Sequence, residues 1–192
     1  SELIELPYEA SNQARNLIDV MANVVGLEKI KEKVQKPLSG LKVACYYGCL
    51  LVRPPEITQF DDPEDPMSMD NIISSLGGEP VYWAYKVECC GASQTSALPK
   101  ATVPLLHRIF QNAFENGADC LAVACPLCFI NLDMRQGGVK KAFQGSYNLP
   151  IFYFTELMGL AFGVSPKELG LKKHFVDPMP LLNSKGILTR AN

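Results

Sequence analysis

Apolar side chains along this chain recur with a helical period in some segments and form short continuous runs in others. Residues 10–34 carry them at helical intervals, which predicts one or two amphipathic helices interrupted near Gly26 and stopped by Pro37. Further helices are predicted over residues 68–76, 100–116, 126–135 and 156–161. Apolar, β-branched and aromatic runs predict buried strands over residues 41–47, 81–85, 120–124 and 150–154. This alternation predicts an α/β fold, with a mostly parallel sheet flanked by helices.

The composition narrows the class of protein. With 192 residues, 47% of them apolar, the chain is long enough to bury a core. A net charge of −2 without long runs of one sign argues against a nucleic-acid partner. No apolar run approaches the roughly 20 residues that cross a bilayer, so we expect no membrane span. The N-terminus does not resemble a secretory signal, so we expect a cytoplasmic protein, and the missing initiator Met indicates a fragment.

Seven cysteines carry most of the candidate chemistry. A cytoplasmic chain is kept reduced, so metal ligation or redox chemistry is a better use for thiols than structural disulfides. Five of them follow predicted strands or open the next helix: Cys49, Cys89, Cys90, Cys125 and Cys128. Carboxyl ends of parallel strands meet at one edge, so we expect these cysteine-bearing loops to meet there. The other two, Cys45 and Cys120, fall inside predicted strands and are interpreted as core residues.

The ordered pattern C-x39-C-C-x34-C-x2-C, with Gly91 after the paired cysteines, resembles the cysteine-rich CCG domain, and more closely the B-type subunit of heterodisulfide reductase. The motifs that carry this resemblance are Tyr46-Tyr47-Gly48-Cys49, Arg53-Pro54, Phe60-Asp61-Asp62-Pro63, Cys89-Cys90-Gly91-Ala92, Cys125-Pro126-Leu127-Cys128 and Asn131-Leu132-Asp133. The resemblance implies a helical connector over residues 1–38 and a CCG domain over residues 39–192, forming the C-terminal half of a longer subunit.

The resemblance also implies a cofactor and a reaction. Cys49, Cys89, Cys90, Cys125 and Cys128 would hold one noncubane [4Fe-4S] cluster through their thiolates. The complete subunit would pair this domain with an N-terminal CCG repeat and cleave a disulfide, such as CoM-S-S-CoB or a bacterial counterpart, between two clusters. The implied partners are iron-sulfur and flavin subunits of a heterodisulfide-reductase-like complex. The isolated chain, with one motif, is expected to be incomplete as an enzyme.

Other interpretations remain open from the residues alone. Cys125-x-x-Cys128 is also compatible with a zinc site or a thioredoxin-like redox pair. The chain could then be a non-catalytic electron-transfer or zinc-stabilised assembly module of a larger oxidoreductase complex. Neither His107 nor His174 has a second histidine at ligand spacing, so both are interpreted as surface or structural residues. Residues 53–66, rich in proline and acids, are expected to form a surface loop, in which Arg53 could contact an anionic substrate.

Overall fold

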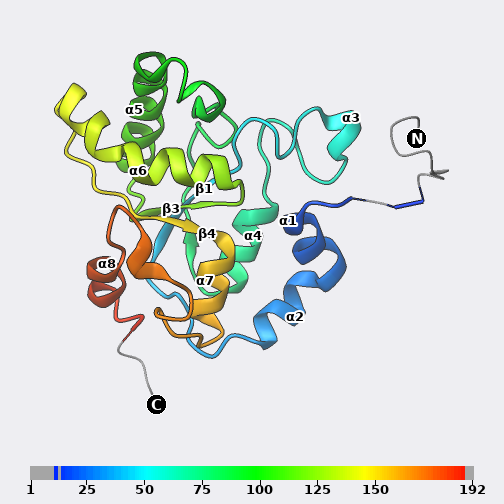
Figure 1. Cartoon of the computed structure of the whole chain (residues 1–192). Coiled ribbons are helices and arrows are strands. Elements are labelled where there is room, and N and C mark those ends of the chain that lie inside the picture. Colours follow the sequence, from blue (N-terminus) through cyan, green and yellow to red (C-terminus); the bar gives the residue numbers. More distant parts are fainter. Residues whose placement is uncertain (1–10, 13, 189–192) are drawn as a thin grey trace, which may run out of the picture.

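A computed structural model describes residues 11–12 and 14–188 and places a parallel four-stranded sheet at the centre of the molecule (Figure 1). Its order is β2-β1-β3-β4, and every neighbouring pair is parallel. The strands are β1 (Lys42–Tyr46), β2 (Glu79–Pro80), β3 (Cys120–Val123) and β4 (Ile151–Tyr153). The α/β fold with a parallel, helix-flanked sheet is therefore confirmed.

Helices connect the strands and cover both faces of the sheet (Figure 1). They are α1 (Leu17–Asp19), which runs through a π-helical turn (Val20–Gly26) into α2 (Leu27–Glu32), α3 (Pro55–Thr58), α4 (Ser68–Ser75), α5 (Pro99–Glu115), α6 (Pro126–Phe143), α7 (Phe154–Ala161) and α8 (Met179–Ser184). Short 3-10 turns lie at Ala92–Gln94 and Leu171–Lys173.

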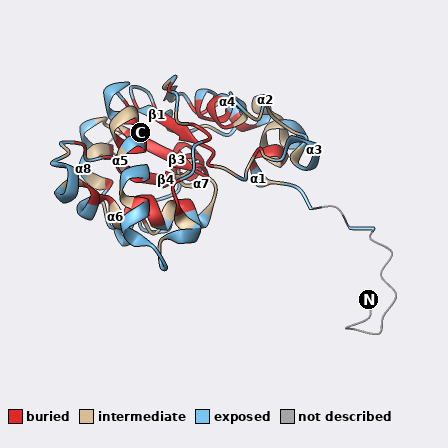
Figure 2. Ribbon diagram, turned by 90° about the horizontal axis from the view of Figure 1, so that it is seen from above, coloured by how far each residue is buried: buried red, intermediate tan, exposed pale blue. Residues whose placement is uncertain are grey.

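The sheet divides the interior into two cores, because successive strand residues face opposite sides. On one side, Val43 and Phe152 pack with Ile18, Ile72 and Leu157 from α1, α4 and α7. The buried residues concentrate around the strands and the helix faces turned toward them (Figure 2). The other core lies against α5 and α6, and it includes Ala44, Tyr46, Phe110, Leu121 and Leu132.

The predicted strand over residues 81–85 is wrong. Strand β2 is shorter and earlier, and its last ladder contact is the Val81 N–H, which donates to the Val43 carbonyl at 2.8 Å. Beyond it the chain turns away from the sheet. Trp83 stays buried there, with its ring centroid 6.1 Å from that of Tyr46, and its Nε1 donates to the Cys45 carbonyl at 3.1 Å. An aromatic run can therefore cover the sheet without joining it.

One predicted helix boundary and one predicted loop also differ from the structure. Helix α6 continues to Phe143 rather than ending near residue 135. Buried Val139 anchors its last turns, and the Gln136 side chain exchanges two hydrogen bonds with the backbone of Leu149, so the helix passes through the following pair of glycines. The loop over residues 53–66 contains the short helix α3. The predicted interruption at Gly26 is confirmed by its positive φ of 88°.

The segment assigned to a connector packs on the body of the domain. Ile18 and Ile30 are buried in the same core as Val43, although the helices that carry them precede the sheet in sequence. The division into residues 1–38 and 39–192 stays a prediction, and parts of both segments, including the predicted helix start at residue 10, lie outside the described residues. Within the described residues, no helix combines the length and apolarity that a membrane crossing requires.

Candidate metal centre

The five predicted ligands come together at the carboxyl edge of the sheet. Cys49 follows β1, and Cys125 directly precedes α6 after β3. Cys128 lies in the first turn of α6, and the adjacent pair Cys89 and Cys90 lies in the loop between β2 and α5. All five line one cavity of about 350 Å³. Three loops separated along the sequence thus supply thiols to one recess, as the strand positions predicted.

The thiols within this recess interact with one another. The Sγ atoms of Cys90 and Cys128 lie 3.7 Å apart, within hydrogen-bond distance for sulfur. This contact lowers the pKa of Cys90 to about 6, against the desolvation that opposes charge, and raises the pKa of Cys128. Burial and a hydrogen bond with Cys89 raise the pKa of Cys49 to about 11. The contact therefore favours the thiolate form of Cys90 over that of Cys128, and a metal bound to both sulfurs would deprotonate Cys128 as well.

Gly91 allows the paired cysteines to approach α5. It adopts a positive φ of 75°, and a Cβ there would lie 2.9 Å from Cγ2 of Thr102. Its N–H also donates to Cys89 Sγ at 3.3 Å. The buried Asn131 of α6 donates from Nδ2 to the Cys90 carbonyl at 2.8 Å. These contacts hold Cys90 against Cys128 on α6.

The buried Lys86 connects the loop that carries Cys49 to the loop that carries Cys89 and Cys90. The N–H groups of Tyr47 and Gly48 donate to the Lys86 carbonyl at 2.8 and 3.0 Å, so the backbone before Cys49 is bound to the backbone before Cys89. The Lys86 ammonium lies 3.1 Å from Asp70 Oδ1. Burial opposes the charge on Lys86, but Asp70 and Asp65 together outweigh it and raise the pKa of the lysine. The backbone thus couples the two loops, and the buried ion pair fixes the second of them to α4.

Comparison with known proteins shows which family the cysteine-bearing segment matches. Residues 43–133 match the family model described as the CCG cysteine-rich domain, and this range contains every cysteine of the recess. The chain carries a CCG domain. The B-type subunit of the ferredoxin:CoB-CoM heterodisulfide reductase of Methanosarcina mazei is 31% identical over 181 residues, covering 93% of this chain and 60% of that protein.

A second relative belongs to a different reductase. The 8-methylmenaquinol:fumarate reductase membrane anchor subunit of Wolinella succinogenes is 32% identical over 176 residues, covering 92% of this chain and 61% of that protein. The chain thus spans about three fifths of the length of these relatives. A crystal structure of a hypothetical protein from Helicobacter pylori shares the fold, with a TM-score of 0.59 at 13% identity over 79% of this chain and 28% of that one.

The remaining two cysteines of the chain lie outside the recess. Cys45 in β1 and Cys120 in β3 are fully buried in the core, and neither lines the cavity. Burial raises the pKa of both thiols. Their interpretation as core residues agrees with this placement.

The two histidines lie away from the recess of the CCG domain. His107 of α5 stacks on Phe143, with ring centroids 4.1 Å apart. The His174 side chain is 4% exposed, and its Nε2 lies 3.0 Å from Glu156 Oε1. Both placements agree with the interpretation of these histidines as surface or structural residues.

Arg53 is held within its own loop. Its Nε donates to the Pro63 carbonyl at 2.9 Å, and it forms an ion pair with Glu64. Asp61 in the same loop accepts from the N–H groups of Met67 and Ser68. The guanidinium of Arg53 therefore organises the loop, and Arg53 does not line the cysteine cavity.

Sequence reasoning missed two buried polar residues that shape the CCG domain. Lys86 and Asp70 lie 16 positions apart, and neither lies in one of the motifs that carry the resemblance. A lysine at that position is expected on the surface from the sequence, but its side chain here is 2% exposed. Their pairing depends on the way β1, α4 and the loop before Cys89 meet, which local spacing does not contain.

Proposed function

We propose that this chain is an iron-sulfur subunit of an oxidoreductase, in which Cys49, Cys89, Cys90, Cys125 and Cys128 hold one noncubane [4Fe-4S] cluster. The observation that carries the proposal is the convergence of these five thiols on one cavity. Thiolates are the preferred protein ligands of iron-sulfur centres. In the longer protein, this centre would act in the reductive cleavage of a disulfide, together with an N-terminal CCG repeat and with iron-sulfur and flavin subunits.

The chain's own residues would prepare the recess for this cofactor. Cys90 already favours its thiolate form, and Asn131 and Gly91 fix the loop that carries it. The half-buried Cys125 and the exposed Cys89 leave one side of the recess open to solvent, where a substrate sulfur could enter. Once bound, the cluster would supply electrons for the disulfide and iron sites for the sulfurs released.

Zinc fits this recess less well than a polynuclear cluster does. A structural zinc site normally has four ligands about 2.0–2.3 Å from a single ion. Five thiols spread around a wider cavity match a centre that contains several metal atoms.

A non-catalytic role is the second candidate. The Wolinella succinogenes relative is described as a membrane anchor subunit, so a protein with this domain can serve to attach a reductase. On this alternative the CCG domain would transfer electrons or stabilise an assembly without binding a disulfide. The cysteine recess alone is compatible with both roles.

The test is the metal content of the anaerobically purified chain and of three cysteine variants. We expect iron and acid-labile sulfide, together with the visible absorption of a thiolate-bound cluster. Cys90→Ala should lose both, whereas the matched core variants Cys45→Ala and Cys120→Ala should retain them. Stoichiometric zinc without iron, or full iron content in Cys90→Ala, would overturn the assignment. In the complete subunit, disulfide turnover with reduced viologen then separates the catalytic role from the non-catalytic one.

A further inference from the structure

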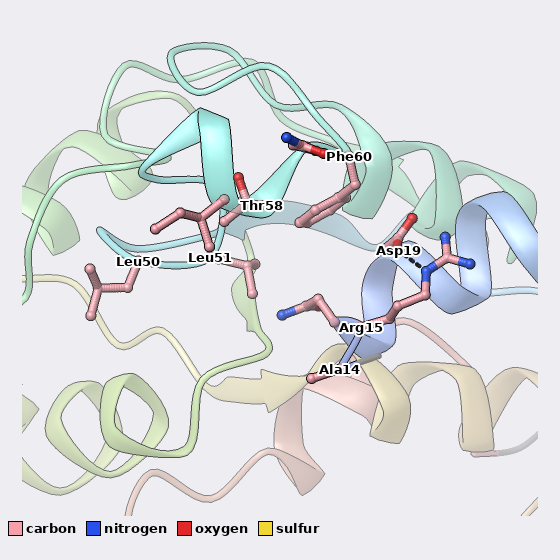
Figure 3. A pocket seen from close by; sticks show the side chains of 10 residues that line it. Ala14, Arg15, Asp19, Leu50, Leu51, Thr58 and Phe60 are labelled. Carbon is pink, nitrogen blue, oxygen red and sulfur yellow. Dashed lines mark hydrogen bonds and ion pairs between the residues drawn. The ribbon is translucent and has the colours of Figure 1, made fainter. Parts of the chain in front are cut away.

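A second cavity adjoins the cysteine recess. This groove, of about 530 Å³, lies between the start of α1 and the loop that contains α3 (Figure 3). Asn16, Leu50 and Leu51 line both cavities, so the two lie side by side. A molecule whose sulfur lies among the cysteines can therefore extend past these three residues into the groove.

The groove has an apolar wall and offers both a hydrogen-bond donor and a hydrogen-bond acceptor. Figure 3 shows Leu51 and Phe60 directed toward its interior from the loop side. Asn16 uses Oδ1 to accept the Ile18 N–H at 2.9 Å, which leaves the Nδ2 donors for a ligand. Across the groove, Gln59 uses Nε2 to donate to the Glu56 carbonyl at 2.7 Å, which leaves Oε1 as an acceptor.

The charges that line the groove compensate each other. Arg15 and Asp19 form an ion pair at 2.6 Å, drawn as the dashed line in Figure 3, and among the described residues that line the groove they are the charged ones. Asp19 also accepts a hydrogen bond from Asn23 at 2.9 Å. An anionic ligand would have to compete with Asp19 for the guanidinium, so the groove favours an uncharged ligand.

We propose that this groove binds the arm of a thiol or disulfide substrate whose sulfur lies in the cysteine recess, and that the arm is an uncharged chain with amide or hydroxyl groups. Methylene segments of such an arm would pack on Leu51 and Phe60. Its carbonyl oxygens would accept from Asn16, and its N–H or hydroxyl groups would donate to Gln59. This inference rests on the proposed function and adds the substrate class.

The experiment compares two probes that differ in one charged group. Pantetheine is an uncharged thiol with two amides and two hydroxyls, and 4′-phosphopantetheine carries the same arm with a phosphate. Binding of each to the cluster-loaded chain is measured anaerobically by calorimetry. Asn16→Asp keeps the oxygen that caps α1 but removes the amide donors, and Leu51→Trp fills the groove. Phe175→Ser, on an exposed residue of a different cavity, is the matched control.

We expect pantetheine to bind at one site and more tightly than its phosphorylated form. Asn16→Asp should weaken binding about tenfold, the effect of losing one hydrogen bond of about 1.4 kcal/mol. Leu51→Trp should abolish binding, and Phe175→Ser should leave it unchanged. Tighter binding of 4′-phosphopantetheine, equal binding in all variants, or no binding to loaded protein would overturn the groove proposal.

Iron and sulfide measured in the same samples separate the two proposals. Protein that lacks iron but binds pantetheine with the expected variant pattern would refute the cluster and retain the groove. Iron-loaded protein that does not bind pantetheine would refute the groove and retain the cluster.

Discussion

Replacing Gly91 by alanine tests the packing of the Cys-Cys-Gly loop against α5. A non-glycine residue in the left-handed region costs about 1–2 kcal/mol, and the φ of Gly91 is +75°. The added Cβ would also lie 2.9 Å from Thr102 Cγ2 and 3.2 Å from Leu105 Cδ1. Overpacking of this kind typically costs about 1–3 kcal/mol, so we expect a loss of about 2–5 kcal/mol in the free energy of unfolding.

Gly117 supplies the matched control for this substitution. Its φ is +78°, yet a Cβ there would meet no atom within 4 Å. Gly117→Ala should therefore lose only the conformational part, about 1–2 kcal/mol. Adding Thr102→Ser to Gly91→Ala removes the clashing Cγ2 and keeps Oγ1, which donates to the Pro99 carbonyl at 2.9 Å. The double variant should recover part of the lost stability.

Urea unfolding of the metal-free chain measures these differences. The two cores include residues from all four strands or the segments that continue them, so the chain should retain its far-ultraviolet circular dichroism without metal. Equal losses for Gly91→Ala and Gly117→Ala would refute the packing argument. Loss of the circular dichroism signal on metal removal would show instead that the metal is part of the fold.

Two further outcomes follow from the side-chain geometry. Mild oxidation of the metal-free protein should form a disulfide between Cys90 and Cys128, whose sulfurs lie 3.7 Å apart, in preference to one between Cys125 and Cys128. Peptide mapping would detect either disulfide. A predominant Cys125–Cys128 disulfide would contradict this prediction. Burial lowers the pKa of His174, but Glu156, with smaller contributions from Asp133 and the Ile151 backbone, outweighs it and raises the pKa above 6.5. Protonated His174 therefore stabilises the folded state. This contribution is complete well below pH 6.5 and is lost as the pH rises through the folded-state pKa of His174. The stability difference between wild type and His174→Gln should shrink as the pH rises above 6.5, and a constant difference would contradict the linkage.

The strands show what a local pattern can and cannot predict. The apolar runs around Val43, Leu121 and Phe152 were correctly interpreted as strands, because a strand buried on both faces is a continuous apolar run. The run around Trp83 has a similar composition but lies on the sheet as a loop, in which the Trp83 side chain rather than its backbone bonds to β1. Composition alone does not distinguish these two outcomes.

More of the cysteine recess than of its surroundings could be predicted from the sequence. The positions of Cys49, Cys125 and Cys128 after two correctly predicted strands were sufficient to place these thiols at one edge, since parallel strands share that edge. Cys89 and Cys90 reach the same edge through a longer loop, because β2 ends at Pro80. The Lys86–Asp70 pair and the groove beside Asn16 could not be predicted, because both arise from the packing of segments that are distant in sequence. Only the three-dimensional arrangement shows that a buried charge and a second cavity border the recess.

The parallel sheet also determines how a bound cofactor would contribute to stability. The segments that carry Cys49, Cys90 and Cys125 are brought together by β1, β2 and β3, so the entropy of closing the long intervening loops is already lost on folding. Occupation of the recess then stabilises the protein by mass action, in proportion to the logarithm of ligand concentration over the dissociation constant. The melting temperature should therefore depend continuously on cofactor supply, and the unfolding transition should remain a single cooperative one.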